Sequence, residues 1–212
     1  MENKFLERDE MVVLLFAYIN HLNYAKNLLD AYKSIFNCRR TEEKLQKINL
    51  SPGFFKMAES ALSKIAILEY SKLFNKKKTE NTIAYLINKV RSNQQLFVDK
   101  SVGKMCDEIE KKMDSELASV ILKLKKRRDK DLAHNDYDYF DGFQNPAIEN
   151  YVSPDDLENL YKIGIDFCFK LFDELLVDNV KMTFQTGADD LDNLLDRVSS
   201  GENTNTGNSV SL

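Results

Sequence analysis

The chain of 212 residues has no tryptophan, three prolines and seven glycines. Proline and glycine are the residues that most often interrupt helices, so their scarcity leaves room for long helical segments. Apolar residues recur at spacings of three and four almost everywhere, and the alternation typical of strands is rare. The sequence therefore predicts an all-α protein.

Cysteine and histidine are also scarce. Cys38, Cys106 and Cys168 stand far apart without a Cys-x-x-Cys pair, which argues against a disulfide framework and against structural zinc and fits a reducing cytoplasm. Neither His21 nor His134 follows a glutamate by three residues, as the metal sites of carboxylate-rich helical bundles require. We expect no metal or other cofactor, and we expect His21 to be a structural histidine.

Long apolar runs are missing as well. The longest, residues 11–19, is too short to cross a bilayer, and no charged leader with a cleavage site precedes it. We expect a soluble, unexported, cytoplasmic protein with no membrane partner.

The formal net charge is −4, which argues against nucleic-acid binding by the whole surface. Locally the sign changes: residues 123–130 hold six bases and one acid, a net +5, and four aspartates follow before residue 142. Such a basic patch can hold phosphate groups or can be a solvated charged face.

The helical spacing predicts helices over residues 9–36, 51–75, 79–91, 103–131 and 153–176, with a connection or short polar helix over 39–47. They are expected to form an antiparallel four-to-five-helix bundle, one domain over residues 1–198. Within it, a short amphipathic piece over 189–198 is expected to dock. Residues 199–212, rich in Ser, Asn, Gly and Thr, are expected to form a disordered tail.

An arginine interrupts the apolar stripe of the 103–131 helix. Arg128 lies about 40° from Leu124 on a helical wheel, inside the apolar sector, whereas Arg127 and His134 fall on its other flank. A guanidinium aimed at a buried surface requires a carboxylate or an anionic ligand beside it. In the last helix Phe167, Phe169 and Phe172 point to more than one side, which predicts a second buried face and a homodimer.

Arg128-Asp129, four residues and then His134, at the end of a helix in an all-α chain, resembles the signature of the HEPN superfamily (higher eukaryotes and prokaryotes nucleotide-binding). Two segments resemble its abortive-infection branch of AbiU type. They are Ser-Pro-Gly-Phe-Phe at residues 51–55, with Leu-Glu at 68–69 and Leu-Phe-Asn at 73–75, and Arg-Asp-Lys-Asp-Leu-Ala-His-Asn-Asp at 128–136. The resemblance covers about residues 5 to 180.

This resemblance implies a dimeric helical bundle in which the Arg/His clusters of two protomers share one cleft. Many such proteins are metal-independent endoribonucleases that serve as toxins or antiphage effectors. By this reading Arg128, Asp129 and His134 are catalytic, and Arg127, Lys130 and Lys126 bind RNA phosphates. RNA, a second copy and an antitoxin protein are the implied partners.

One feature departs from the toxins that a nucleotidyltransferase antitoxin controls. They often carry a tyrosine two residues after the histidine, where this chain has Asp136, with Tyr137 next, so control by nucleotidylation is not expected. The alternative prediction is a non-catalytic dimerisation or binding module, in which Arg128 pairs with an acid such as Glu69 and His134 caps the helix end.

Overall fold

The computed structural model describes residues 6–77, 81–99, 101–129 and 146–175. Every regular element in these ranges is helical. The elements are α1 (Arg8–Cys38), α2 (Glu42–Asn49), α3 (Pro52–Leu73), α4 (Ile83–Ser92), the 3₁₀ turn η1 (Gln94–Leu96), α5 (Val102–Asp114), α6 (Ala118–Arg127), α8 (Pro146–Glu149) and α9 (Pro154–Glu174). The prediction of an all-α fold is confirmed.

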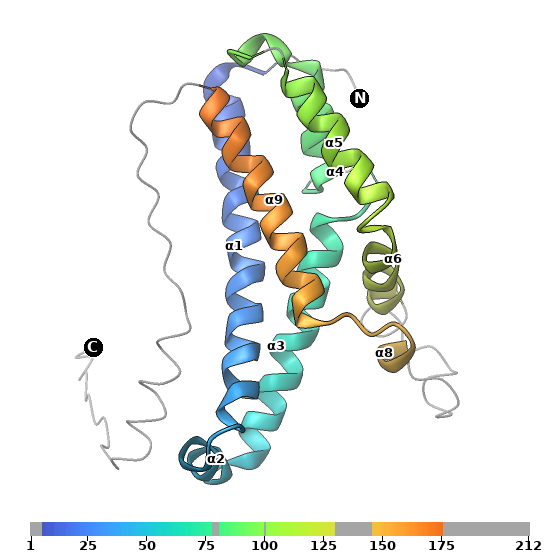
Figure 1. Ribbon diagram of the computed structural model, residues 1–212. Coiled ribbons are helices and arrows are strands. Elements are labelled where there is room, and N and C mark those ends of the chain that lie inside the picture. Colours follow the sequence, from blue (N-terminus) through green and yellow to red (C-terminus); the bar gives the residue numbers. More distant parts are fainter. Residues whose placement is uncertain (1–5, 78–80, 100, 130–145, 176–212) are drawn as a thin grey trace, which may run out of the picture.

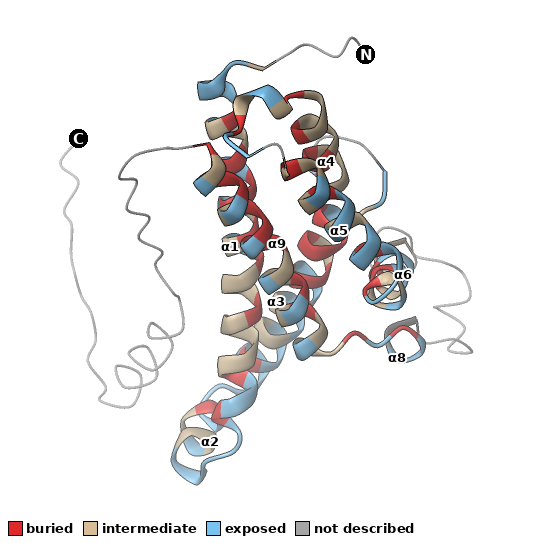
Figure 2. Cartoon of the chain, turned by 45° about the horizontal axis from the view of Figure 1, so that its top comes forward, coloured by how far each residue is buried: buried red, intermediate tan, exposed pale blue. Residues whose placement is uncertain are grey.

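Three long helices, α1, α3 and α9, form the centre of the molecule. α1 makes its most extensive contacts with α3 and α9, and α2 lies at the end of the molecule where the chain passes from α1 to α3 (Figure 1). α4 packs on α5, α5 also touches α9, and α6 lies against α3. The buried residues form one large cluster through these helices, with a smaller cluster at the α2 end (Figure 2). α1 supplies a buried stripe at helical spacing: Met11, Leu15, Ile19, Leu22 and Leu29.

The predicted start of α9 is confirmed. Ser153 accepts a hydrogen bond from the Asp156 N–H at 3.1 Å, and the Asp156 side chain accepts one from the Ser153 N–H at 2.9 Å. This reciprocal pair satisfies two N–H groups that the first helical turn leaves without partners. Pro52 likewise opens α3, although Ser51 makes no side-chain capping bond there.

Two predicted helices differ from the structure. α4 begins at Ile83 and is capped by Thr82, whose hydroxyl accepts from the Tyr85 N–H, whereas we expected a start at Thr79, which lies outside the described residues. The predicted 103–131 helix is two helices, α5 and α6, separated at Ser115–Leu117. Ser115 leaves the helical region (φ −118°, ψ −84°), and its hydroxyl donates to the Lys111 carbonyl at 2.7 Å. Such a side-chain bond competes with the helical ladder and bends helices.

A glycine lets α9 approach its neighbours closely. A Cβ atom at Gly164 would lie 2.9 Å from Leu22 Cδ2 on α1 and 3.3 Å from Cζ of Phe74, the residue that caps α3. Side-chain carbons in a packed core do not come that close. Gly164 therefore sets the separation of the three central helices.

The phenylalanines of α9 are mostly used inside the protomer. Phe167 and Phe172 are buried, and the Phe172 ring packs edge-on against Phe16 of α1 at a centroid distance of 5.1 Å. Phe169 is partly buried against the same core. All three rings therefore contact the core of their own chain, which weakens the case for a homodimer face on this helix.

All three cysteines are buried and none forms a disulfide. Burial raises the pKa of the Cys106 thiol to about 11 and that of the Cys168 thiol to about 12. No helix in the described ranges is long and apolar enough to cross a membrane. The predicted docking piece 189–198 and the tail 199–212 lie outside the described residues.

Candidate functional site

The predicted site lies at the end of α6. Arg128 caps this helix, and the chain continues through Arg128 and Asp129 as a π-type turn. The Arg128 guanidinium donates to Asp129 Oδ1 from Nε at 2.8 Å and from Nη2 at 2.6 Å. Both side chains keep access to solvent, with 21% and 42% of their surface exposed. The Arg128 guanidinium is therefore held in one orientation and is still accessible from solvent, as a side chain that binds a ligand must be.

The burial of the two arginines is the reverse of what the helical wheel predicted. Arg127 is buried, with 7% of its surface exposed, while Arg128 is the partly exposed one. The buried positions of α6 are Ile121, Leu124 and Arg127, in steps of three, so the buried stripe drifts toward the Arg127 side. The connection leading into α9 covers that side, because Tyr151 and Val152 line a cavity together with Arg127.

Arg127 lines a small cavity of about 40 Å³ that four parts of the chain enclose. Tyr32 of α1, Ser63 of α3 and Tyr151 and Val152 before α9 share this lining. The Arg127 side chain therefore lies between α6 and the rest of the bundle. The predicted contact of Arg127 with an RNA phosphate would require the phosphate to enter this cavity.

The remaining predicted residues divide into two groups. Lys126 is exposed, as is Lys125 before it, so both lysines extend the positive surface next to Arg128. Lys130, His134, Asp136 and Tyr137 lie outside the described residues.

The non-catalytic alternative paired Arg128 with an acid such as Glu69, but Glu69 has other partners in the structure. Its carboxylate binds His21 Nε2 of α1 at 2.7 Å and Lys72 Nζ at 2.7 Å, because α3 faces α1 at this level. Burial alone would raise the pKa of Glu69, but the hydrogen bonds from Lys72 and His21 outweigh burial and place its pKa below the usual value of 4.5. His21 thus has the structural role expected of it.

This lowered pKa predicts a pH-dependent contribution to stability. Since the folded protein favours the charged carboxylate, the contribution is fully present above pH 4.5 and is lost as the pH falls through the lower folded-state value. We expect Glu69→Gln to lower the free energy of unfolding at pH 7 by about 1.5 kcal/mol, and the difference from wild type to shrink in acid. Urea melts between pH 3 and pH 7, roughly the range in which carboxyl groups titrate, measure this. Glu43→Gln, at an 81% exposed side chain bound to Lys47, is the control, and an equal loss there would refute the assignment.

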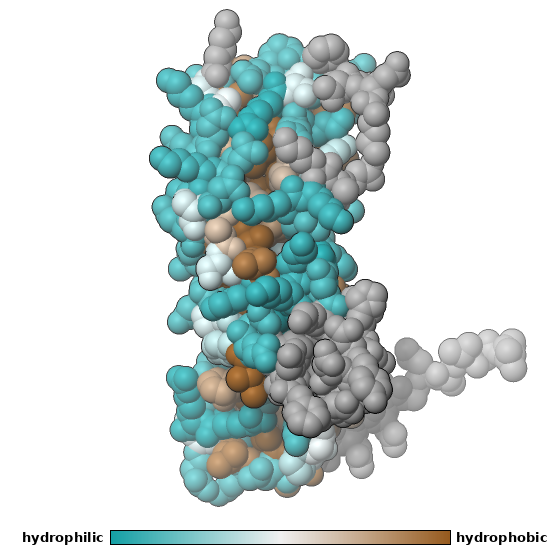
Figure 3. All heavy atoms as spheres, turned by 90° about the vertical axis from the view of Figure 1, so that its right-hand side faces the viewer, coloured by the Kyte–Doolittle hydropathy of each residue, from teal (hydrophilic) through white to brown (hydrophobic). Residues whose placement is uncertain are grey.

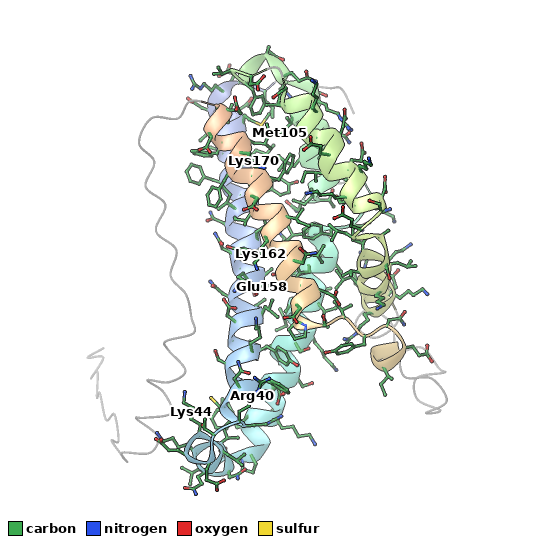
Figure 4. The ribbon with its side chains drawn as sticks, viewed as in Figure 1. Arg40, Lys44, Met105, Glu158, Lys162 and Lys170 are labelled. Atoms are coloured by element: carbon green, nitrogen blue, oxygen red, sulfur yellow. The ribbon has the colours of Figure 1, made fainter. Side chains whose placement is uncertain are left out.

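A second polar cluster, which the sequence analysis missed, joins α1 to α9. Lys26 Nζ binds Asp30 Oδ2 at 2.6 Å and approaches Glu158 Oε2 at 3.5 Å, and Tyr161 donates to Asn23 Oδ1 at 2.9 Å. Figure 4 labels Glu158 on the part of α9 that faces α1. Only the i,i+4 spacing of Lys26 and Asp30 is visible in the sequence, and the other contacts join residues more than 130 positions apart. The cluster fixes the alignment of two helices.

Within the described ranges, no group of three or more His, Cys, Asp or Glu side chains is arranged to hold a metal ion. The chemistry available at the end of α6 is that of cationic side chains and an oriented carboxylate. The cationic side chains can bind phosphate by charge-assisted hydrogen bonds.

Comparison with known proteins identifies the family of the chain and leaves the roles of the site residues as predictions. No curated protein and no solved structure matches the chain. The family model HEPN_AbiU2, described as AbiU2, matches residues 9–197. The matched range contains the whole Arg128–His134 segment and all of the described helices except Arg8, the first residue of α1. The chain therefore belongs to the AbiU2 family of HEPN proteins.

Proposed function

We propose that this protein is an abortive-infection effector of the cytoplasm that cleaves RNA without a metal ion, through Arg128, Asp129 and His134 of two protomers. The observation that carries the proposal is the Arg128–Asp129 pair. A family-type arginine lies at a helix end, oriented by its neighbour through two hydrogen bonds and still partly exposed. Membership in the AbiU2 family supports the biological role.

The residue types suit a transfer within the phosphodiester. One imidazole of His134 removes the proton from a ribose 2′-OH, the 2′-oxygen attacks phosphorus, and a second imidazole gives a proton to the departing 5′-oxygen. Arg128 holds the phosphate oxygens, on which negative charge accumulates during the attack. The bond formed is 2′-O–P and the bond broken is P–O5′. The products are a 2′,3′-cyclic phosphate and a 5′-hydroxyl.

A homodimer completes this scheme. Each chain has one histidine in the motif, and the two proton transfers require one group that accepts and another that donates. Two copies of His134 in a shared cleft divide these tasks. Arg127, Lys126 and Lys130 are proposed to add phosphate contacts around the cleft, and an antitoxin protein is a proposed partner that keeps the effector inactive.

One observation favours a second candidate function. Arg128 already has an intramolecular carboxylate partner in Asp129, so its charge is partly compensated without RNA. A non-catalytic HEPN module that binds another protein would use this pair as a structural feature of the helix end. The two candidates differ in whether RNA is cut.

Cleavage by the full-length protein in EDTA tests the proposal. We expect unstructured RNA to be cut with 2′,3′-cyclic phosphate ends, and Arg128→Ala to lower the cleavage rate roughly a hundredfold, because a donor to the developing phosphate charge is lost. Arg40→Ala is the matched control, since Arg40 is an exposed arginine at the α2 end of the molecule, between α1 and α2 and not on α6 (Figure 4). It should cleave like wild type.

Two results would contradict the proposal. The first would be that purified wild-type protein at high micromolar concentration leaves RNA intact in EDTA. The second would be that the Arg128→Ala and Arg40→Ala proteins cut RNA equally fast. The first result supports the binding-module function, and the second assigns the activity to a contaminant or to a different part of the surface.

A further inference from the structure

A groove of about 490 Å³ lies between the end of α3 and the length of α6. Its floor and walls are mostly apolar, and Leu122, with 52% of its surface exposed, stands in the opening. In Figure 3, which faces the α6 side, apolar surface patches interrupt an otherwise hydrophilic surface. The apolar lining residues are Phe74, Ala118, Ile121, Leu122 and Leu124.

Lysines form the rim of the groove. Lys76, Lys77 and Lys125 line it and all three are exposed. Lys76 binds Asp114 at 2.5 Å, whereas Lys77 and Lys125 have no carboxylate partner within the described ranges. An apolar floor suits neither RNA nor a free phosphate. An apolar floor with a basic rim fits a helical segment that carries leucines on one face and acids on the other.

The chain itself contains such a segment at residues 189–198, here named the acidic segment. Leu191, Leu194, Leu195 and Val198 follow the spacing i, i+3, i+4, i+7, which places them on one face of a helix. The other positions hold four aspartates and one arginine, for a net charge of −3. The match to the AbiU2 family continues to residue 197, so the acidic segment belongs to the family domain.

The acidic segment can reach the groove. The Val98 N–H donates to the Glu174 carbonyl at 3.0 Å, so the end of α9 lies beside the start of α5. α5, with 13 residues, then spans about 20 Å toward α6. The 13 residues of 176–188 extend up to about 45 Å, which is more than twice that length.

We propose that the acidic segment of the same chain docks as a helix in this groove, with its leucines over Leu122 and its aspartates beside Lys77 and Lys125. This contact is separate from RNA cleavage. It adds a further helix to the bundle and places negative charge one turn before Arg128.

Zero-length carbodiimide cross-linking of the full-length protein, followed by peptide mapping, tests the contact. We expect Lys77 and Lys125 to be joined to aspartates of the acidic segment, with little coupling to the exposed lysines Lys56 and Lys64 of α3. The Lys76–Asp114 pair, already in contact, is the internal positive control. A mixture of ¹⁵N-labelled and unlabelled protein separates coupling within one chain from coupling between chains.

A groove variant adds a quantitative test. Leu122→Gln is expected to lower the docking equilibrium by about tenfold, because the apolar contact of a leucine is lost, and the yield of the Lys77 and Lys125 cross-links falls with it. Val13→Gln, at a residue of α1 that is 67% exposed, should leave the yield unchanged. The proposal is overturned if the acidic segment couples equally to Lys56 and Lys64, if the groove lysines stay uncoupled while Lys76–Asp114 forms, or if the cross-links are of mixed isotope. RNA cleavage is not a readout, so failure here leaves the proposed function intact.

Discussion

Replacing His134 with alanine is expected to lower the rate of RNA cleavage by about 10²- to 10⁴-fold, the usual contribution of general acid–base catalysis. In the proposed mechanism the change removes the proton acceptor and the proton donor together, because each protomer of the proposed dimer supplies one His134. The measurement is the single-turnover cleavage rate in EDTA, with the circular dichroism of the variant confirming that it is folded.

The other histidine provides the control. His21 lies on α1 and binds Glu69, so His21→Ala is expected to change stability and to leave the cleavage rate of the folded protein unchanged. Equal loss of activity in both variants would mean that His134 acts through the fold. Full activity of His134→Ala would remove it from the mechanism.

Gly164→Val is expected to lower the free energy of unfolding by about 2–3 kcal/mol, in the range of overpacked cores. The new Cβ atom alone would lie 2.9 Å from Leu22 Cδ2, and valine adds two methyl groups beyond it. The gain in helix propensity from removing a glycine, below about 1 kcal/mol, offsets only part of this loss. Thermal melts should show a decrease in Tm of about 4–12 °C.

Gly53 is a matched site for this experiment. It lies in the first turn of α3, and nothing is within 4 Å of a Cβ atom built there. Gly53→Val should therefore melt close to wild type. If both valine variants melt at the same temperature, the central helices have room to separate, and Gly164 does not set their spacing.

The main helices of the bundle follow directly from local sequence signals. α1 was expected over 9–36 and spans Arg8–Cys38, and α9 begins at the Ser153-Pro154 pair as expected. These signals are local: apolar spacing, a proline in the first turn and a capping side chain. Family membership was also accessible, since the residues that carry the resemblance lie in short segments of the sequence.

Features that depend on distant neighbours could not be predicted in the same way. The break between α5 and α6 contains Ser115, Glu116 and Leu117, with neither glycine nor proline to indicate it. The burial of Arg127 instead of Arg128 depends on which side of α6 the connection to α9 covers. One of the two partners of Glu69 is a histidine 48 residues away, and pairs of this kind depend on how helices are aligned.

The burial of all three cysteines has a practical consequence for experiments on this protein. Only the thiolate reacts with maleimides, and with a pKa of about 11 for Cys106 and about 12 for Cys168 almost no thiolate exists at neutral pH, while Cys38 is shielded from reagents by its burial. A fluorophore or spin label attached to a newly introduced surface cysteine will therefore report from that position alone, and the natural cysteines need not be removed.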